Sequence, residues 1–332
     1  MVEKRRVRMR LTAMTVLFVI CFFGSFMLGR YPIEPWTLIR VLASRVIPVT
    51  PDWPSQVETV LFNVRLPRVL MAALIGAGLS AAGAAYQGIF KNPMVSPDVL
   101  GASSGAGFGA ALGLFLSFSY QGVSFLAFIS GLSAVAVVCL ISGRVKYNQT
   151  LGLVLAGMMV SSLFTAAVSF LKLVADPNNT LPVITYWLMG SLASIRPKDL
   201  AFAAPWVIGG IIPICLMRWK INVLTLGEEE ARCIGVNTGA VRLAVVLCAT
   251  LITSAAVSVS GLIGWVGLVI PHFARMLVGS DYRKMLPASL LLGASFLVVD
   301  NFARASGPAN PIGSHRVCGS AVFPLADPEG RK

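Results

Sequence analysis

Few side chains in this sequence could perform covalent chemistry or hold a metal ion. The 332 residues include two histidines and six cysteines, and no two cysteines have the CxxC spacing of a zinc or redox site. His272 follows a proline inside an apolar run, where we expect a hydrogen-bonded structural residue. We therefore predict no catalytic centre, no metal site and no cofactor bound by this chain. The cysteines are Cys21, Cys139, Cys215, Cys233, Cys248 and Cys318.

The composition is that of a membrane protein. Hydrophobic residues make up 56% of the chain and charged residues 12%, about half the charged fraction of a soluble domain. A water-soluble enzyme is therefore excluded. Because a membrane-spanning helix needs about 20 mostly apolar residues, the apolar runs predict an all-α polytopic membrane protein with nine recognisable spans. The runs cover residues 11–28, 66–90, 97–117, 121–142, 151–174, 200–217, 240–260, 262–278 and 286–300.

The basic residues predict how the chain is oriented in the membrane. The formal net charge is +13. If the amino-terminus is cytoplasmic, fifteen lysines and arginines lie in cytoplasmic segments and seven in external ones, in agreement with the positive-inside rule. The first run, 11–28, is then an uncleaved first helix. Since residues 30–64 contain five prolines, which break helices, we predict an external loop there with at most one short helix.

Three long stretches resemble the permease subunits of ABC importers for iron–siderophore complexes, haem and cobalamin. They are residues 65–107, which begin with Arg65-Leu-Pro-Arg68, residues 226–236, and residues 264–300, which include Pro271-His272. The resemblance implies a ten-helix permease fold in the cytoplasmic (inner) membrane. It also implies three kinds of partner: a second permease subunit, identical or paralogous, two ATP-binding subunits, and an extracytoplasmic substrate-binding protein.

ATP and Mg²⁺ are then expected on the ATPase partner, because no phosphate-binding G-x-x-x-x-G-K-[ST] motif occurs in this chain. We predict that the chain is a transport subunit and not an enzyme. We also expect contact with membrane lipid and none with nucleic acid.

The resemblance assigns three groups of residues. Arg65, Arg68 and Arg304 would dock the binding protein, since the arginine fork binds carboxylates; the alternative is contact with lipid headgroups. Short coupling helices at about 224–238 would bind the ATPase, and the alternative is a solvated loop. Glu228 to Glu230 favour a helix amino end there, and Gly235 favours a turn. The coupling residues are Leu226, Gly227, Glu228, Glu229, Glu230, Ala231 and Gly235; the gate and pathway residues are Asn92, Met94, Thr150, Met158, Ser161 and Ser162.

The carboxyl end departs from this family. Residues 1–313 form the predicted permease domain, whereas 314–332 form an aberrant tail, too short and too broken by Pro324 and Pro328 to span a membrane. Synonymous codons for 314–332 can be chosen so that reading one nucleotide later gives Val-Thr-Gly-Phe-Val-Gly-Ala-Pro-Phe-Phe-Leu-Trp-Leu-Ile-Arg-Lys. We therefore hypothesise that a frameshift removes the tenth helix.

The predicted function is import of an iron complex, a ferric siderophore, by alternating access. Haem and cobalamin remain alternatives on the same fold. An ion-coupled secondary transporter is the alternative from another class, and it would need carboxylates near the middle of the membrane. Asp176 and Asp300 instead lie at the ends of apolar runs.

Overall fold

The computed structural model describes residues 2–27, 31, 33–44, 52–144 and 149–306. Within these ranges the regular structure is helical, which confirms the all-α prediction. Seven described helices are long and apolar enough to cross a membrane, and two shorter apolar helices, Ala102–Phe115 and Val266–Val278, account for the other predicted spans. The predicted tail, 314–332, lies outside the described residues.

The described elements follow in chain order. They are α1 (Val2–Met27), α2 (Pro35–Ala43), α3 (Ser55–Thr59), a π-helical turn η1 (Val60–Arg65), α4 (Leu66–Ile89), a 3₁₀ turn η2 (Pro97–Leu100), α5 (Ala102–Phe115), α6 (Tyr120–Ser142), α7 (Gln149–Val174), α8 (Thr180–Leu188), α9 (Pro197–Leu216), α10 (Arg218–Leu224), α11 (Glu228–Cys233), α12 (Thr238–Ser260), α13 (Val266–Val278) and α14 (Tyr282–Ser306).

The proline-rich segment before α4 contains more helix than predicted. Pro35 is the first residue of α2, and Pro54 is the N-cap of α3, which continues through η1 into α4. The expectation of at most one short helix was therefore wrong. A proline at the start of a helix sacrifices no intrahelical hydrogen bond, so these prolines mark where helices begin.

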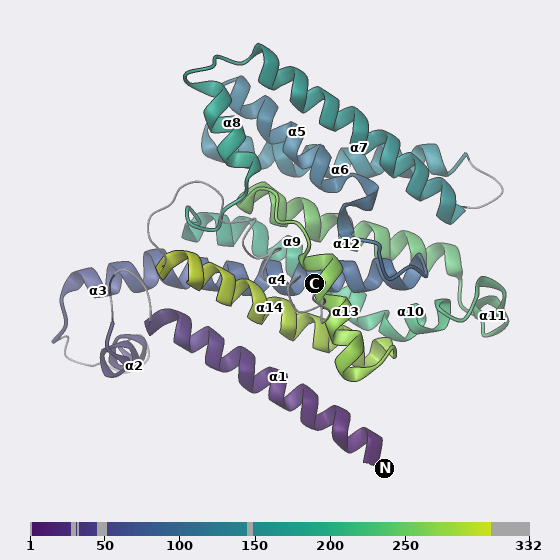
Figure 1. Cartoon of the computed structure of the whole chain (residues 1–332), viewed down its shortest axis with the longest axis horizontal. Coiled ribbons are helices and arrows are strands. Elements are labelled where there is room, and N and C mark those ends of the chain that lie inside the picture. Colours follow the sequence, from purple (N-terminus) through teal and green to yellow (C-terminus); the bar gives the residue numbers. More distant parts are fainter. Residues whose placement is uncertain (1, 28–30, 32, 45–51, 145–148, 307–332) are drawn as a thin grey trace, which may run out of the picture.

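The helices form a layered bundle (Figure 1). α5, α6 and α7 lie at one side, α9 and α12 follow, then α4 and α14, and α1 lies at the opposite side. α4 and α12 are the most buried of the long helices. In the most apolar stretch of each, 83% and 72% of the residues are buried, whereas in α1 the share is 17%. α4 and α12 therefore form the centre of the subunit.

Two sets of helices repeat the same order of lengths. The first set has a long α4 of 24 residues, a short α5 of 14 and a long α6 of 23, and the second has α12 of 23, α13 of 13 and α14 of 25. α4 packs against α12 at the centre, and each also packs against the third helix of the other set. In the first set a fourth helix, α7, packs on α5 and α6.

Small residues on α5 form a helix contact. A Cβ atom added to Gly105 would lie 2.7 Å from the Ser130 carbonyl oxygen, and one added to Gly109 would lie 2.5 Å from that of Leu126. Both oxygens belong to α6, so α5 and α6 approach backbone to backbone as expected for small-residue faces in membranes. Gly101, four residues before Gly105, follows η2 with φ +81°.

Candidate functional site

The predicted coupling segment folds into short helices. α11 begins at Glu228, so the three glutamates occupy its first turn, and Gly235 leaves the helix with φ +84°. Both features follow the sequence prediction. The range 224–238 contains α11 and the start of α12, whereas the second short helix, α10, lies before it. The range predicted for the helix pair therefore lies too far toward the carboxyl end of the chain, because it leaves out most of α10.

The surface around α11 combines apolar and acidic side chains. Leu226 is 67% exposed and Ile234 is 52% exposed, and both flank the exposed carboxylates of Glu229 and Glu230. Ala231 is fully buried and anchors α11 to the rest of the chain. An apolar rim with carboxylates is typical of a protein-binding surface.

Arg242 connects this segment to two membrane helices. The side chain, on α12, is buried. Its Nη2 donates to Glu228 Oε1, and its Nη1 donates to Gln149 Oε1 at 3.2 Å. Gln149 is the first residue of α7 and is followed by Thr150, a predicted gate residue that is half-buried. Sequence reasoning counted Arg242 only as a cytoplasmic charge.

The predicted gate loop is a tight turn. The Asn92 side chain accepts a hydrogen bond from the Met94 backbone N–H at 2.9 Å, and the Asn92 N–H donates to the Gln87 carbonyl at 3.2 Å. Met94 is 73% exposed as a result. Asn92 thus shapes the turn, and Met94 is the side chain that the turn presents.

The predicted pathway residues on α7 differ in exposure. Met158 and Ser162 are exposed, and beside them lies Met159, 69% exposed. Ser161 is half-buried and faces Gly101, where an added Cβ would lie 2.9 Å from the serine Oγ. Ser161, predicted as a pathway residue, therefore lies where α7 meets the turn between η2 and α5.

The hydroxyls along α7 donate to their own helix. Ser162 Oγ bonds to the Met158 carbonyl at 2.9 Å, and Thr165 Oγ1 bonds to the Ser161 carbonyl at 2.8 Å. Ser169 Oγ does the same with Thr165 at 3.0 Å. The exposed face consequently presents methionine side chains and hydroxyls whose protons already form hydrogen bonds within the helix.

The three predicted docking arginines lie at the opposite end of the bundle from α11, and each has an internal partner. Arg65 donates to the carbonyls of Phe26 and Tyr31. Arg68 Nε donates to Asn301 Oδ1 at 2.5 Å, which ties α4 to α14. Arg304 makes a bidentate ion pair with Asp300, at 2.7 and 3.0 Å. All three are therefore held in fixed orientations.

A buried amide lies beneath the gate loop. Gln87, 2% exposed, accepts from Arg275 Nη2 at 2.8 Å and donates to the Leu268 carbonyl at 3.2 Å. α4 and α13 are thereby joined next to the turn that Asn92 forms. The expectation that His272 is a hydrogen-bonded structural residue inside an apolar run was wrong, since its side chain is exposed on α13.

Comparison with known proteins identifies the family. Residues 17–313 match the model of the FecCD transport family. A molybdate import system permease of Haemophilus influenzae is 39% identical over 90% of this chain and 88% of its own length. A Fe(3+)-citrate import system permease of Bacillus subtilis is 36% identical over 76% of this chain and 75% of its own. Further relatives are named for cobalamin and hemin.

A solved structure of an inward-facing metal-chelate type ABC transporter has a TM-score of 0.84 and 34% identity, and the match covers 95% of this chain and 96% of that one. Its fold agrees with the helical arrangement described above. Membership of this family excludes the ion-coupled secondary transporter. The chain is a multi-pass membrane protein and belongs to the FecCD transport family of ABC-importer permeases.

Proposed function

We propose that this permease imports a ferric siderophore across the inner membrane, with its amino-terminus in the cytoplasm. The observation that carries the cargo class is the exposed face of α7, where methionines and internally bonded hydroxyls offer no strong grip to a ligand. Such a face suits a bulky complex that must slide. The relative named for Fe(3+)-citrate supports an iron complex.

The proposed motor is a pair of ATP-binding subunits that contact the α11 surface of two permease subunits. ATP and Mg²⁺ would be bound by these partners. Movement of α11 would reach α7 through Glu228, Arg242 and Gln149, because the arginine contacts both side chains. The Asn92–Met94 turn and Thr150 would form the gate that this movement opens.

Transport by sealed vesicles tests the cargo. The permease is reconstituted with its ATPase and binding protein, and uptake of a radioactive ferric siderophore is measured with and without ATP. We expect ATP-dependent uptake of the iron complex. Molybdate, haem and cobalamin are offered in parallel, since relatives carry those names. Uptake of molybdate alone would contradict the siderophore assignment and leave the permease assignment intact.

The docking role of the arginines is testable with matched variants. Arg68→Glu reverses the charge, whereas Asn301→Ala removes the internal hydrogen-bond partner and keeps the charge. If Arg68 meets acidic groups of the binding protein, Arg68→Glu should abolish uptake and slow association with the binding protein, while Asn301→Ala should retain both. Equal losses in the two variants would show that Arg68 acts only by joining α4 to α14.

A further inference from the structure

The carboxyl end of α4 is joined to three other helices immediately before the Asn92–Met94 turn, here named the gate turn. α10, α13 and α14 all pack against α4. Their contacts with its last turn centre on Gln87 and Gly88, which are both buried. The end of α4 is therefore placed to receive movement from its neighbours.

Gln87 holds the gate turn through its backbone. Lys91 adopts a left-handed conformation with φ +50°. Its N–H donates to the Gly88 carbonyl at 3.3 Å, and the Asn92 N–H donates to the Gln87 carbonyl at 3.2 Å. These two bonds form the Schellman arrangement that ends many helices. The position of the gate turn therefore follows the position of Gln87.

The side chain of Gln87 binds α13 twice. Its Oε1 accepts from Arg275 Nη2 at 2.8 Å, and its Nε2 donates to the Leu268 carbonyl at 3.2 Å. One helical turn away α4 meets α13 backbone to backbone, since a Cβ added to Gly83 would overlap the Gly267 carbonyl oxygen. A shift of α13 at this level must therefore displace α4.

α10 contacts the same place. Its Ile221 is fully buried, and a Cβ added to Gly88 would lie 2.6 Å from Ile221 Cγ2. The next residue, Asn222, accepts a hydrogen bond from the Tyr282 N–H at 3.0 Å through its Oδ1. The Tyr282 ring lies 3.1 Å from the same added Cβ, and the Tyr282 side chain interacts with Arg275. α10 is thus connected to Arg275 through the first residue of α14.

We propose that Arg275 positions the gate turn and transmits movement of α10 to it. Movement of α10 passes through Tyr282 to Arg275 and from there, through Gln87, to the backbone of Asn92. The inference rests on the proposed function, which assigns the turn to the gate and the neighbouring α11 surface to the ATPase. It adds a route separate from that of Arg242, which leads to α7.

An arginine suits this position because of its donors. The guanidinium carries five N–H groups in a fixed plane, so one side chain can bind an amide on α4 and a phenol on α14 at once. A lysine keeps the charge on a flexible stem and lacks the planar fork. A methionine keeps the length and removes both the charge and the donors.

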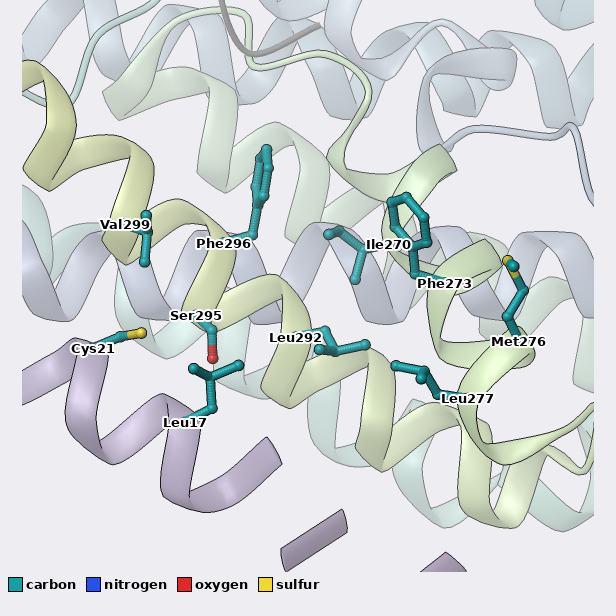
Figure 2. A pocket seen from close by; sticks show the side chains of 10 residues that line it. All are labelled: Leu17, Cys21, Ile270, Phe273, Met276, Leu277, Leu292, Ser295, Phe296 and Val299. Atoms are coloured by element: carbon teal, nitrogen blue, oxygen red, sulfur yellow. The ribbon is translucent and has the colours of Figure 1, made fainter. Parts of the chain in front are cut away.

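The opposite face of α13 supplies a matched control. Figure 2 shows Met276 and Leu277 of α13 beside an apolar groove of about 450 Å³ that α1 and α14 also line. Arg10 of α1 donates to the Leu277 carbonyl. Arg10 and Arg275 therefore bind the same end of one helix, and of the two it is Arg275 that is bonded to Gln87.

Thiol labelling of the gate turn tests the route. Met94, 73% exposed, is replaced by cysteine in a chain with Cys233→Ser, because Cys233 is the exposed cysteine among the described residues. The assembled transporter is labelled with and without a nonhydrolysable ATP analogue, and the labelling of the chain that retains Met94 is subtracted. We expect the two rates to differ by about fivefold or more, as is usual for coupled sites.

Substitutions of the two arginines then give the comparison. In Arg275→Met the ratio of the two rates should fall nearly to one, while ATP hydrolysis continues. Arg10→Met should keep the ratio of the parent chain, and Arg275→Lys should restore part of it. A parent ratio that persists in Arg275→Met would overturn the proposal and leave the gate assignment intact.

A second reporter separates lost transmission from a general loss of packing. Ser162→Cys lies on the exposed part of α7 and reports the route through Arg242, so its response to nucleotide should survive Arg275→Met. Loss of both responses would show that Arg275 only supports the fold, against the proposal. A parent chain in which Met94→Cys does not respond would contradict the gate assignment itself, and the inference would fail with it.

Discussion

At the scale of single residues, Arg242 is the most informative side chain in the structure. It is buried, it carries a charge, and its two contacts lie 14 and 93 residues away along the chain. A buried charge is retained at a cost unless it is paired. The pairing here joins the coupling segment to the first residue of α7.

Removal of this charge should uncouple transport from ATP hydrolysis. In Arg242→Met we expect uptake to fall by about tenfold, within the range for residues that carry coupling between sites, while ATP hydrolysis by the assembled transporter continues. Gln149→Ala should show a smaller loss of the same kind. Both rates are measured in the same vesicles. Parallel losses of uptake and hydrolysis would indicate a folding defect in place of a coupling role.

The two neighbouring serines of α7 should behave differently. A cysteine in place of Ser162 is exposed, whereas one in place of Ser161 faces Gly101. We expect Ser162→Cys to react with a small thiol reagent many times faster than Ser161→Cys. Equal labelling of the two would contradict the assigned rotation of α7.

At the scale of the elements, the contact between α5 and α6 depends on the absence of side chains. Gly109→Leu should destabilise the chain in detergent, because the new atoms would meet the Leu126 carbonyl; overpacking of this kind costs about 1–3 kcal/mol. Gly209→Leu, on α9, is the matched control, since an added Cβ meets nothing there within 4 Å. Thermal unfolding of both variants gives the comparison, and similar melting temperatures would refute it.

Helix positions were predictable because apolar runs of spanning length leave few alternatives. The predicted run 121–142 corresponds to α6, Tyr120–Ser142, and the predicted run 66–90 corresponds to α4, Leu66–Ile89. Pro35 and Pro54 were misread, since proline breaks a helix or begins one according to its position.

The candidate site was less predictable, because its contacts are made between distant segments. The sequence around Arg242 gives no indication that Gln149 is its hydrogen-bond partner. Whether the side of α7 at Ser161 is covered depends on where η2 packs, and the sequence of neither segment alone determines this. The internal bonds of Arg65, Arg68 and Arg304 likewise exist only once α1, α4 and α14 are assembled.

At the scale of the whole molecule, the two ends of the bundle differ in chemistry. α11 with its three glutamates lies at one end, and the ion pair of Arg304 lies at the other. Figure 1 shows α11 and α3 on opposite sides of the subunit. An orientation with α11 in the cytoplasm follows from the proposed function.

Cys233 provides the test of that orientation. It is the exposed cysteine among the described residues, on α11, whereas the other described cysteines are partly buried. A membrane-impermeant thiol reagent should label it in inside-out vesicles and leave it unlabelled in intact cells stripped of their outer membrane. The reverse pattern would contradict a cytoplasmic coupling segment.

The hydroxyls of α7, which donate hydrogen bonds within their own helix, bear on how such a transporter acquires a new cargo during evolution. If this helix lines the passage, the passage makes few demands on what moves through it, and no residue there must be replaced when the cargo changes. If Arg65, Arg68 and Arg304 dock the binding protein as proposed, a new binding protein that fits these arginines would suffice. Relatives are named for molybdate, ferric citrate, cobalamin and hemin. Such a range of cargoes is expected of a passage with low selectivity that is served by exchangeable binding proteins.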